Sequence, residues 1–115
     1  MLSGLNRTWI GVAAGVMVGG AVLVAPVLAQ DGVTIQLFRF APTSIEVPAG
    51  TKIVFRNEDD ITHTVTSGSP EYRNGAFDHQ LVGQGATAIV ELSQPGVYPY
   101  FCDRHRSMRG EIRVK

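Results

Sequence analysis

Short apolar or alternating segments separated by turn residues fill the chain after residue 30, and this pattern most limits the fold. The segments of strand length lie at 33–37, 44–47, 52–56, 61–66, 88–92 and 110–114. Turn signals rich in proline, glycine, asparagine and aspartate separate many of them, at 41–42, 48–50, 57–60 and 94–96. No stretch holds a sustained helical period, and the polar segment 67–75 is expected to be an exposed loop. The sequence therefore predicts an all-β fold, an antiparallel β-sandwich or barrel.

The first thirty residues have a different character. Arg7 is their only charge, an apolar run covers 10–24, and a small-residue site ends at Ala29. This order is typical of a secretory signal peptide, and the run is shorter than the roughly 20 residues of a membrane span. We predict a signal peptide at 1–29 and one domain at 30–115, with a periplasmic or other extracytoplasmic location. An uncleaved N-terminal membrane anchor is the alternative.

Charge and cysteine content exclude several classes of function. Ten basic and ten acidic side chains give no net charge, whereas nucleic-acid binding calls for a basic patch. A single cysteine cannot form an internal disulfide, and a thiol exposed to an oxidising compartment is prone to oxidation. A free thiol in an exported chain is therefore best explained by metal ligation.

The only cysteine lies in a cluster of possible metal ligands. Cys102, His105 and Met108 follow the spacing Cys-x2-His-x2-Met. His63 lies 39 residues before the cysteine on a predicted strand, and a sandwich can bring such distant strands together at one end. Two imidazoles, a thiolate and a weak axial thioether form a blue-copper site, suited to cycling between Cu(I) and Cu(II). With four protein ligands, no position stays open for a substrate.

The chain resembles cupredoxins of the plastocyanin/amicyanin group across 33–115. The resemblance rests on "FAPTSIEVPAGTKIVFRNEDDITHTV" and on "GVYPYFCDRHRSMRGEIRV". It implies a Greek-key β-sandwich and one type 1 copper bound by His63, Cys102, His105 and Met108. It also implies that Asn57 joins the two ligand segments and hydrogen-bonds near the cysteine sulfur, and that His105 lies at an exposed edge within an apolar patch.

The function implied is that of an exported blue copper protein, not an enzyme, which carries single electrons between redox protein partners. It is expected to act as a monomer, with no nucleic-acid partner and no small-molecule substrate. The alternative is a periplasmic protein for copper buffering or delivery. Structural zinc fits poorly because methionine is a poor zinc ligand. A Cys-His nucleophile would need substrate access that so small a sandwich hardly offers.

The ligand loop departs from the family pattern at Arg106, where amicyanin-like loops usually carry proline. Arginine does not fix φ as proline does, so we expect a more mobile loop with an added charge beside the electron exit. Arg104, Arg106 and Arg109 form either a basic rim for an acidic partner or a solvated face.

The remaining histidine and two tyrosines have simpler readings. His79 is expected to be a solvated loop residue. Tyr98 and Tyr100 share a strand face with Cys102 by period two, which suggests that both pack near the site.

Overall fold

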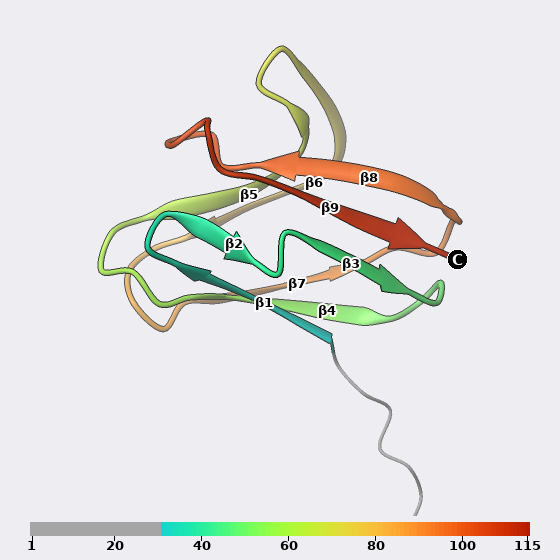
Figure 1. Ribbon diagram of the computed structural model, residues 1–115, viewed down its shortest axis with the longest axis horizontal. Helices are drawn as coiled ribbons and strands as arrows, with labels where there is room; N and C mark the ends of the chain where they lie inside the picture. The colour runs from blue at the N-terminus through green and yellow to red at the C-terminus, as the bar shows by residue number, and fades with distance from the viewer. Residues whose placement is uncertain (1–30) are drawn as a thin grey trace, which may run out of the picture.

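Two β-sheets packed face to face form the described part of the chain, residues 31–115, in the computed structural model (Figure 1). The predicted signal peptide lies outside the described residues. In residues 31–115 every regular element is a strand: β1 Asp31–Gln36, β2 Arg39–Ala41, β3 Ser44–Val47, β4 Lys52–Asn57, β5 His63–Ser69, β6 Tyr72–Leu81, β7 Thr87–Glu91, β8 Gly96–Phe101 and β9 Arg109–Val114.

The predicted sandwich is confirmed, but its sheets are mixed and not purely antiparallel. One sheet has the order β2-β1-β4-β7 and the other β3-β9-β8-β5-β6. Two pairs are parallel, β1 with β4 and β3 with β9. The chain leaves the first sheet after β2 and enters the second at β3, so β3 meets the far strand β9 and not its neighbour in sequence. Hydrophobic periodicity identifies a strand without identifying its partner.

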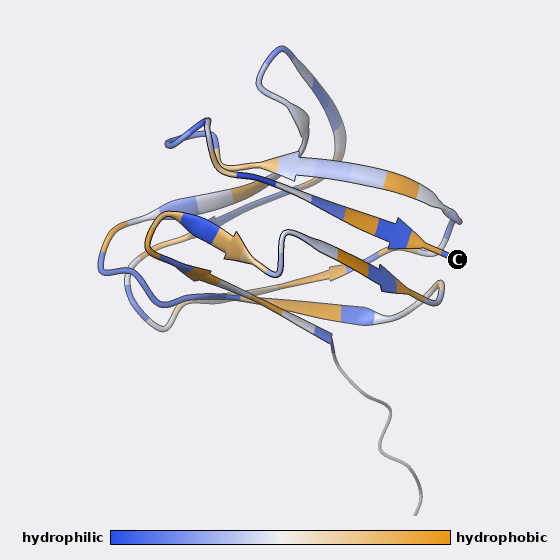
Figure 2. Cartoon of the chain, in the orientation of Figure 1, coloured by the Kyte–Doolittle hydropathy of each residue, from blue (hydrophilic) through white to orange (hydrophobic). Residues whose placement is uncertain are grey.

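Alternation along each strand builds the core between the two sheets. On β1, Val33 and Ile35 are almost fully buried, while the residues beside them are at least partly exposed. Figure 2 shows the same alternation as successive polar and apolar bands along β9. At the centre, the Tyr100 ring meets Phe40 and Phe55 edge to face, with ring centroids 4.7 and 5.2 Å apart. Tyr100 is thus a core residue, and the expectation that Tyr98 and Tyr100 pack near the site stays a prediction.

The prediction that the segment 67–75 is simply an exposed loop is wrong. Ser67 is fully buried in β5, and its hydroxyl both donates to Phe77 O (3.0 Å) and accepts from Phe77 N (2.9 Å). The register of β5 on β6 shifts between Thr66 and Gly68, where Gly68 has a φ of 103°. Strand β6 continues through 72–81, so His79 lies on a strand and not in a loop. Only the tip of this hairpin projects from the sandwich (Figure 1).

Within residues 31–115, no helix is long and apolar enough to cross a membrane.

Candidate metal centre

His63 is the buried member of the candidate site. It opens β5, and its side chain has no exposed surface. Nε2 lies 2.8 Å from Asp59 Oδ2, while Nδ1 lies 3.6 Å from Cys102 Sγ. Since a carboxylate only accepts hydrogen bonds, Nε2 carries the proton and Nδ1 is left as the nitrogen that faces the thiol.

The other three residues come from the turn between β8 and β9. Cys102 follows β8 directly and is fully buried, His105 is half-buried, and Met108 is 3% exposed just before β9. Met108 N donates to His105 O (2.9 Å) and Cys102 N donates to Met108 O (3.1 Å), so backbone hydrogen bonds close the loop.

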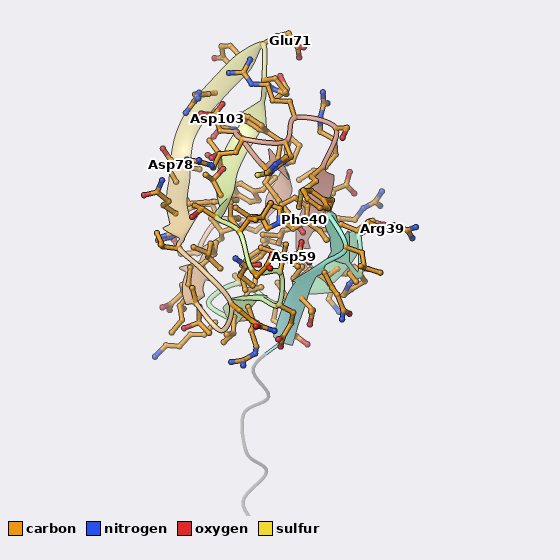
Figure 3. All side chains as sticks on the ribbon, turned by 90° about the vertical axis from the view of Figure 1, so that its left-hand side faces the viewer. Arg39, Phe40, Asp59, Glu71, Asp78 and Asp103 are labelled. Carbon is orange, nitrogen blue, oxygen red and sulfur yellow. The ribbon has the colours of Figure 1, made fainter. Side chains whose placement is uncertain are left out.

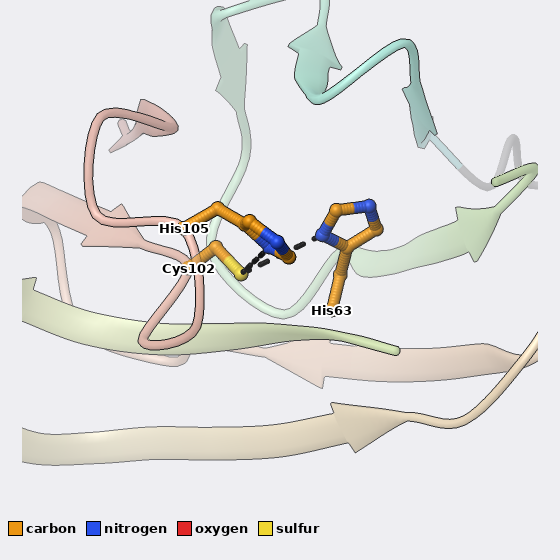
Figure 4. Close-up of side chains that lie close together, drawn as sticks. All are labelled: His63, Cys102 and His105. Atoms are coloured by element: carbon orange, nitrogen blue, oxygen red, sulfur yellow. Dashed lines mark hydrogen bonds between the residues drawn. The ribbon is translucent and has the colours of Figure 1, made fainter. Parts of the chain in front are cut away.

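Nitrogen and sulfur donors from the two segments converge in space. Cys102 Sγ lies 3.9 Å from His105 Nδ1, and the donor atoms of His63, Cys102 and His105 all lie within 4.8 Å of one another (Figure 4). Thr64 N also donates to the sulfur, at 3.3 Å. A hydrogen bond to sulfur stabilises the thiolate form, which is the metal-binding form.

Asn57 lies fully buried at the end of β4, but its contacts differ from those that the family resemblance implied. Its amide donates to Ile61 O (2.7 Å), Gly83 O (3.1 Å) and Leu81 O (3.3 Å). These bonds join the β4–β5 loop to the segment after β6, and none reaches the loop that holds the cysteine.

The direct link between the two ligand segments comes from Thr64. Its hydroxyl accepts a hydrogen bond of 2.7 Å from Asp103 N, the amide that follows Cys102. The same hydroxyl lies 3.0 Å from Thr66 Oγ1. Thr64 therefore ties β5 to the ligand loop immediately beside both His63 and Cys102.

Sequence reasoning missed Asp59, which in the sequence is only one residue of the turn signal at 57–60. Burial raises the pKa of Asp59, but hydrogen bonds from Phe38 N, Leu37 N and the His63 ring outweigh it, so the pKa lies below its ordinary value. The one available signal was its spacing, four residues before a candidate ligand. The turn residues that it binds lie more than 20 positions earlier in the chain.

Ionic contacts brace the loop around Arg106. Asp103 bonds Arg106 Nη2 at 3.0 Å and Arg73 Nη2 at 2.5 Å, and the Arg73 contact is the largest cause that lowers the pKa of Asp103. Arg109 Nε donates to Arg106 O at 2.9 Å. The guanidinium of Arg73 also lies 5.8 Å from the centre of the Phe101 ring. Arg106 thus takes part in a network that supplies contacts where the usual proline would supply rigidity.

His105 reaches the molecular surface. It lines an open depression together with Ile61, Thr62 and Arg104. Phe38, which is 50% exposed, packs edge-on against His105 with ring centroids 4.9 Å apart. The candidate ligand nearest to solvent therefore lies beside both apolar and basic side chains.

Comparison with known proteins identifies the relatives of this chain. The family described as copper binding proteins, plastocyanin/azurin family, matches residues 28–115. Plastocyanin A/B of Petroselinum crispum is 34% identical over 65% of this chain and 86% of that protein. The minor chloroplastic plastocyanin isoform of Arabidopsis thaliana is 31% identical over 87% of this chain and 63% of its own length.

Solved structures share the fold. A purple cupredoxin from Nitrosopumilus maritimus superposes with a TM-score of 0.67 at 21% identity, over 75% of this chain and all of that one. A reduced Cu(I) form of an amicyanin mutant also gives 0.67 at 20% identity, over 80% of this chain and 86% of that one.

The donor set suits copper. Two imidazole nitrogens and one thiol sulfur converge, with a buried methionine in the same loop, and this combination fits a single type 1 copper. The chain belongs to the plastocyanin/azurin family of copper-binding proteins, as a cupredoxin of the plastocyanin/amicyanin group.

Proposed function

We propose that the protein carries single electrons between larger redox proteins through one type 1 copper. The observation that supports this most is the convergence of His63 Nδ1, Cys102 Sγ and His105 Nδ1 within 4.8 Å, from segments 39 residues apart. When bound there, copper supplies the one-electron change between Cu(I) and Cu(II).

Each ligand has a separate role in the proposal. Cys102 would supply the strong thiolate, His63 and His105 the two imidazoles, and Met108 the weakly bound thioether. A buried scaffold closed by backbone hydrogen bonds would hold these groups in nearly one arrangement in both oxidation states of a bound copper. Small rearrangement on electron gain or loss favours fast transfer, and a site filled by protein ligands favours carriage of electrons over conversion of a substrate.

His105 is the proposed point of electron exchange. His63 is fully buried, whereas His105 is half-buried and opens onto the depression lined by Ile61 and Arg104. A redox protein docked on this face would come nearest to the site at the His105 ring. We also propose that residues 1–29 are a signal peptide and that the domain at 30–115 works outside the cytoplasm as a monomer.

The test is spectroscopic and electrochemical. Protein loaded with Cu(II) should show an intense thiolate-to-copper absorption band, narrow hyperfine splitting in electron paramagnetic resonance, and reversible one-electron voltammetry. Cys102→Ser, which is close in size and lacks the thiolate, should lose the band.

A pale Cu(II) complex would refute the electron-carrier proposal. A blue complex that hands Cu(I) rapidly to a competing chelator would instead indicate copper buffering or delivery.

A further inference from the structure

We propose that Asp59 is a positioning residue for this site. It orients the His63 ring and holds the turn that places Phe38 against both imidazoles, and its negative charge lowers the reduction potential of the copper. The role for the potential rests on the proposed electron-carrier function. The role in orienting His63 stands on the contacts of the protein itself. Figure 3 shows Asp59 and Asp103 at the end of the sandwich that holds the ligand loop.

The contact with His63 is close and shielded from solvent. Asp59 Oδ2 lies 2.8 Å from His63 Nε2, with 12% of the Asp59 side chain and none of the His63 side chain exposed. A carboxylate that accepts a hydrogen bond from one ring nitrogen fixes the tautomer and the rotation of the imidazole. It also makes the other nitrogen a better electron-pair donor to a metal. Nδ1 of His63 therefore faces Cys102 without a proton, which leaves its lone pair free to bind a metal.

The same carboxylate holds the turn between β1 and β2. Oδ1 accepts from Leu37 N at 2.8 Å and Oδ2 from Phe38 N at 3.1 Å. Leu37 and Phe38 have φ values of 54° and 60°. Side chains of this size rarely adopt positive φ, so the two hydrogen bonds stabilise a backbone shape that the residues themselves disfavour.

This turn places Phe38 over the candidate site. Its ring is edge-on to His63 at 5.4 Å and to His105 at 4.9 Å between centroids. Leu37, by contrast, is 76% exposed. One carboxylate thus orients a ring that would ligate the metal and the aromatic ring that covers the pair of imidazoles.

Asp59 is itself held in place by Asn57. Asp59 N donates to Asn57 Oδ1 at 2.9 Å, and the Asn57 amide is fixed by three backbone carbonyl groups. Asn57 therefore reaches the site through Asp59 and His63, and not through the cysteine. A fixed carboxylate can position its partner, whereas a mobile one could not.

Within the described part of the chain no lysine or arginine pairs with Asp59, and its one side-chain partner among basic residues is the His63 ring, which is neutral when only Nε2 carries a proton. Asp103, by contrast, pairs with two arginines. An unbalanced negative charge in a site shielded from water favours the more positive metal ion. Asp59 should therefore stabilise Cu(II) over Cu(I) and lower the midpoint potential.

Asp59→Asn is the variant that tests the charge, with Glu58→Gln as its matched control. Both remove one negative charge from adjacent positions. Glu58, however, bonds Arg56 Nε at 2.6 Å and has no hydrogen bond to His63. In Asp59→Asn, one carboxylate oxygen becomes an NH₂ group that cannot accept from the donors facing Asp59.

For Asp59→Asn, we expect the ratio of Cu(II) affinity to Cu(I) affinity to fall about tenfold. This value is at the lower end of the loss in metal affinity that follows when a group that orients a ligand is changed. A tenfold change corresponds to a rise of about 59 mV in midpoint potential. Glu58→Gln should move the potential far less. Equal potentials in the two variants, with a blue wild-type protein, would overturn the role of the Asp59 charge and leave the electron-carrier function standing.

A second measurement uses the copper-free full chain and needs no variant to fold. Nitrogen-15 NMR of the wild-type histidine rings should show His63 protonated at Nε2 and not at Nδ1. A proton on Nδ1 would overturn the positioning role. This readout is independent of copper, so it tests the Asp59 proposal separately from the proposed function. Failure of the proposed function would show instead as a pale copper complex of the wild-type protein.

Discussion

Replacing Tyr100 with phenylalanine should stabilise the copper-free protein. The ring is 1% exposed at the centre of the core, and its hydroxyl oxygen has no hydrogen-bond partner among residues 31–115. Burial correspondingly raises the pKa of this phenol far above its ordinary value. Burying a hydroxyl without a partner costs about 1–3 kcal/mol.

The opposing contribution is small. Losing one oxygen atom removes a few van der Waals contacts, each worth about 0.1–0.2 kcal/mol, while the ring contacts with Phe40 and Phe55 remain. The net gain should be about 1 kcal/mol, which raises Tm by about 4–8 °C in a domain of this size. Urea unfolding with linear extrapolation and calorimetry would measure both quantities.

Tyr98→Phe provides a control on the same strand. The Tyr98 hydroxyl donates to Gln94 O at 2.8 Å in an exposed position, so its removal should lower the free energy of unfolding by up to about 1 kcal/mol. The two tyrosine-to-phenylalanine changes should therefore have opposite signs. If Tyr100→Phe lowers stability as much as Tyr98→Phe does, the Tyr100 hydroxyl has a partner, such as a buried water, and the reasoning is wrong.

Three further predictions concern the scaffold of the site. Thr64→Val should lower the free energy of unfolding by about 1–3 kcal/mol in urea titrations, because Asp103 N loses its acceptor; an unchanged midpoint would contradict this. Gly110→Ala should cost about 1–3 kcal/mol, since an added Cβ would overlap the Tyr100 ring; a variant of wild-type Tm would show that the strands adjust. The pKa of Asp59 lies below its ordinary 3.8, so the stability from its ionised form is full above about pH 4 and is lost as pH falls through the lower folded pKa. Urea midpoints measured from pH 5 to pH 2 should therefore fall less in Asp59→Asn than in wild type.

The candidate ligand loop, 102–108, could be singled out from the sequence because its possible donors lie close together along the chain. The spacing of Cys102, His105 and Met108 fits one turn, and thiol, imidazole and thioether together are donors that suit copper. His63 could be added because any sandwich brings distant strands together. The strand β3 was also predicted with the bounds observed, since its alternation is regular.

The features that escaped prediction depend on residues far apart in the chain. The segment 67–75 is polar and rich in turn residues and therefore predicts a loop, yet Ser67 is buried with its hydroxyl satisfied by the backbone of Phe77, ten residues later. The role of Asp59 depends on a turn of positive φ at Leu37 and Phe38, which neither residue type suggests. Composition and periodicity describe a segment, whereas these contacts depend on which segments meet.

The position of Arg73 has a consequence for protein engineering. It lies on β6, outside the ligand loop, and yet it binds Asp103 next to Cys102 and covers Phe101. The loop 102–108 is therefore not a portable module. If the loop were grafted onto another sandwich whose hairpin lacks an arginine at this place, Asp103 would keep only Arg106 as an ion-pair partner. The graft would then have the right ligand spacing but would lack the contact with Arg73. A transplant of this loop should include the β5–β6 hairpin with it.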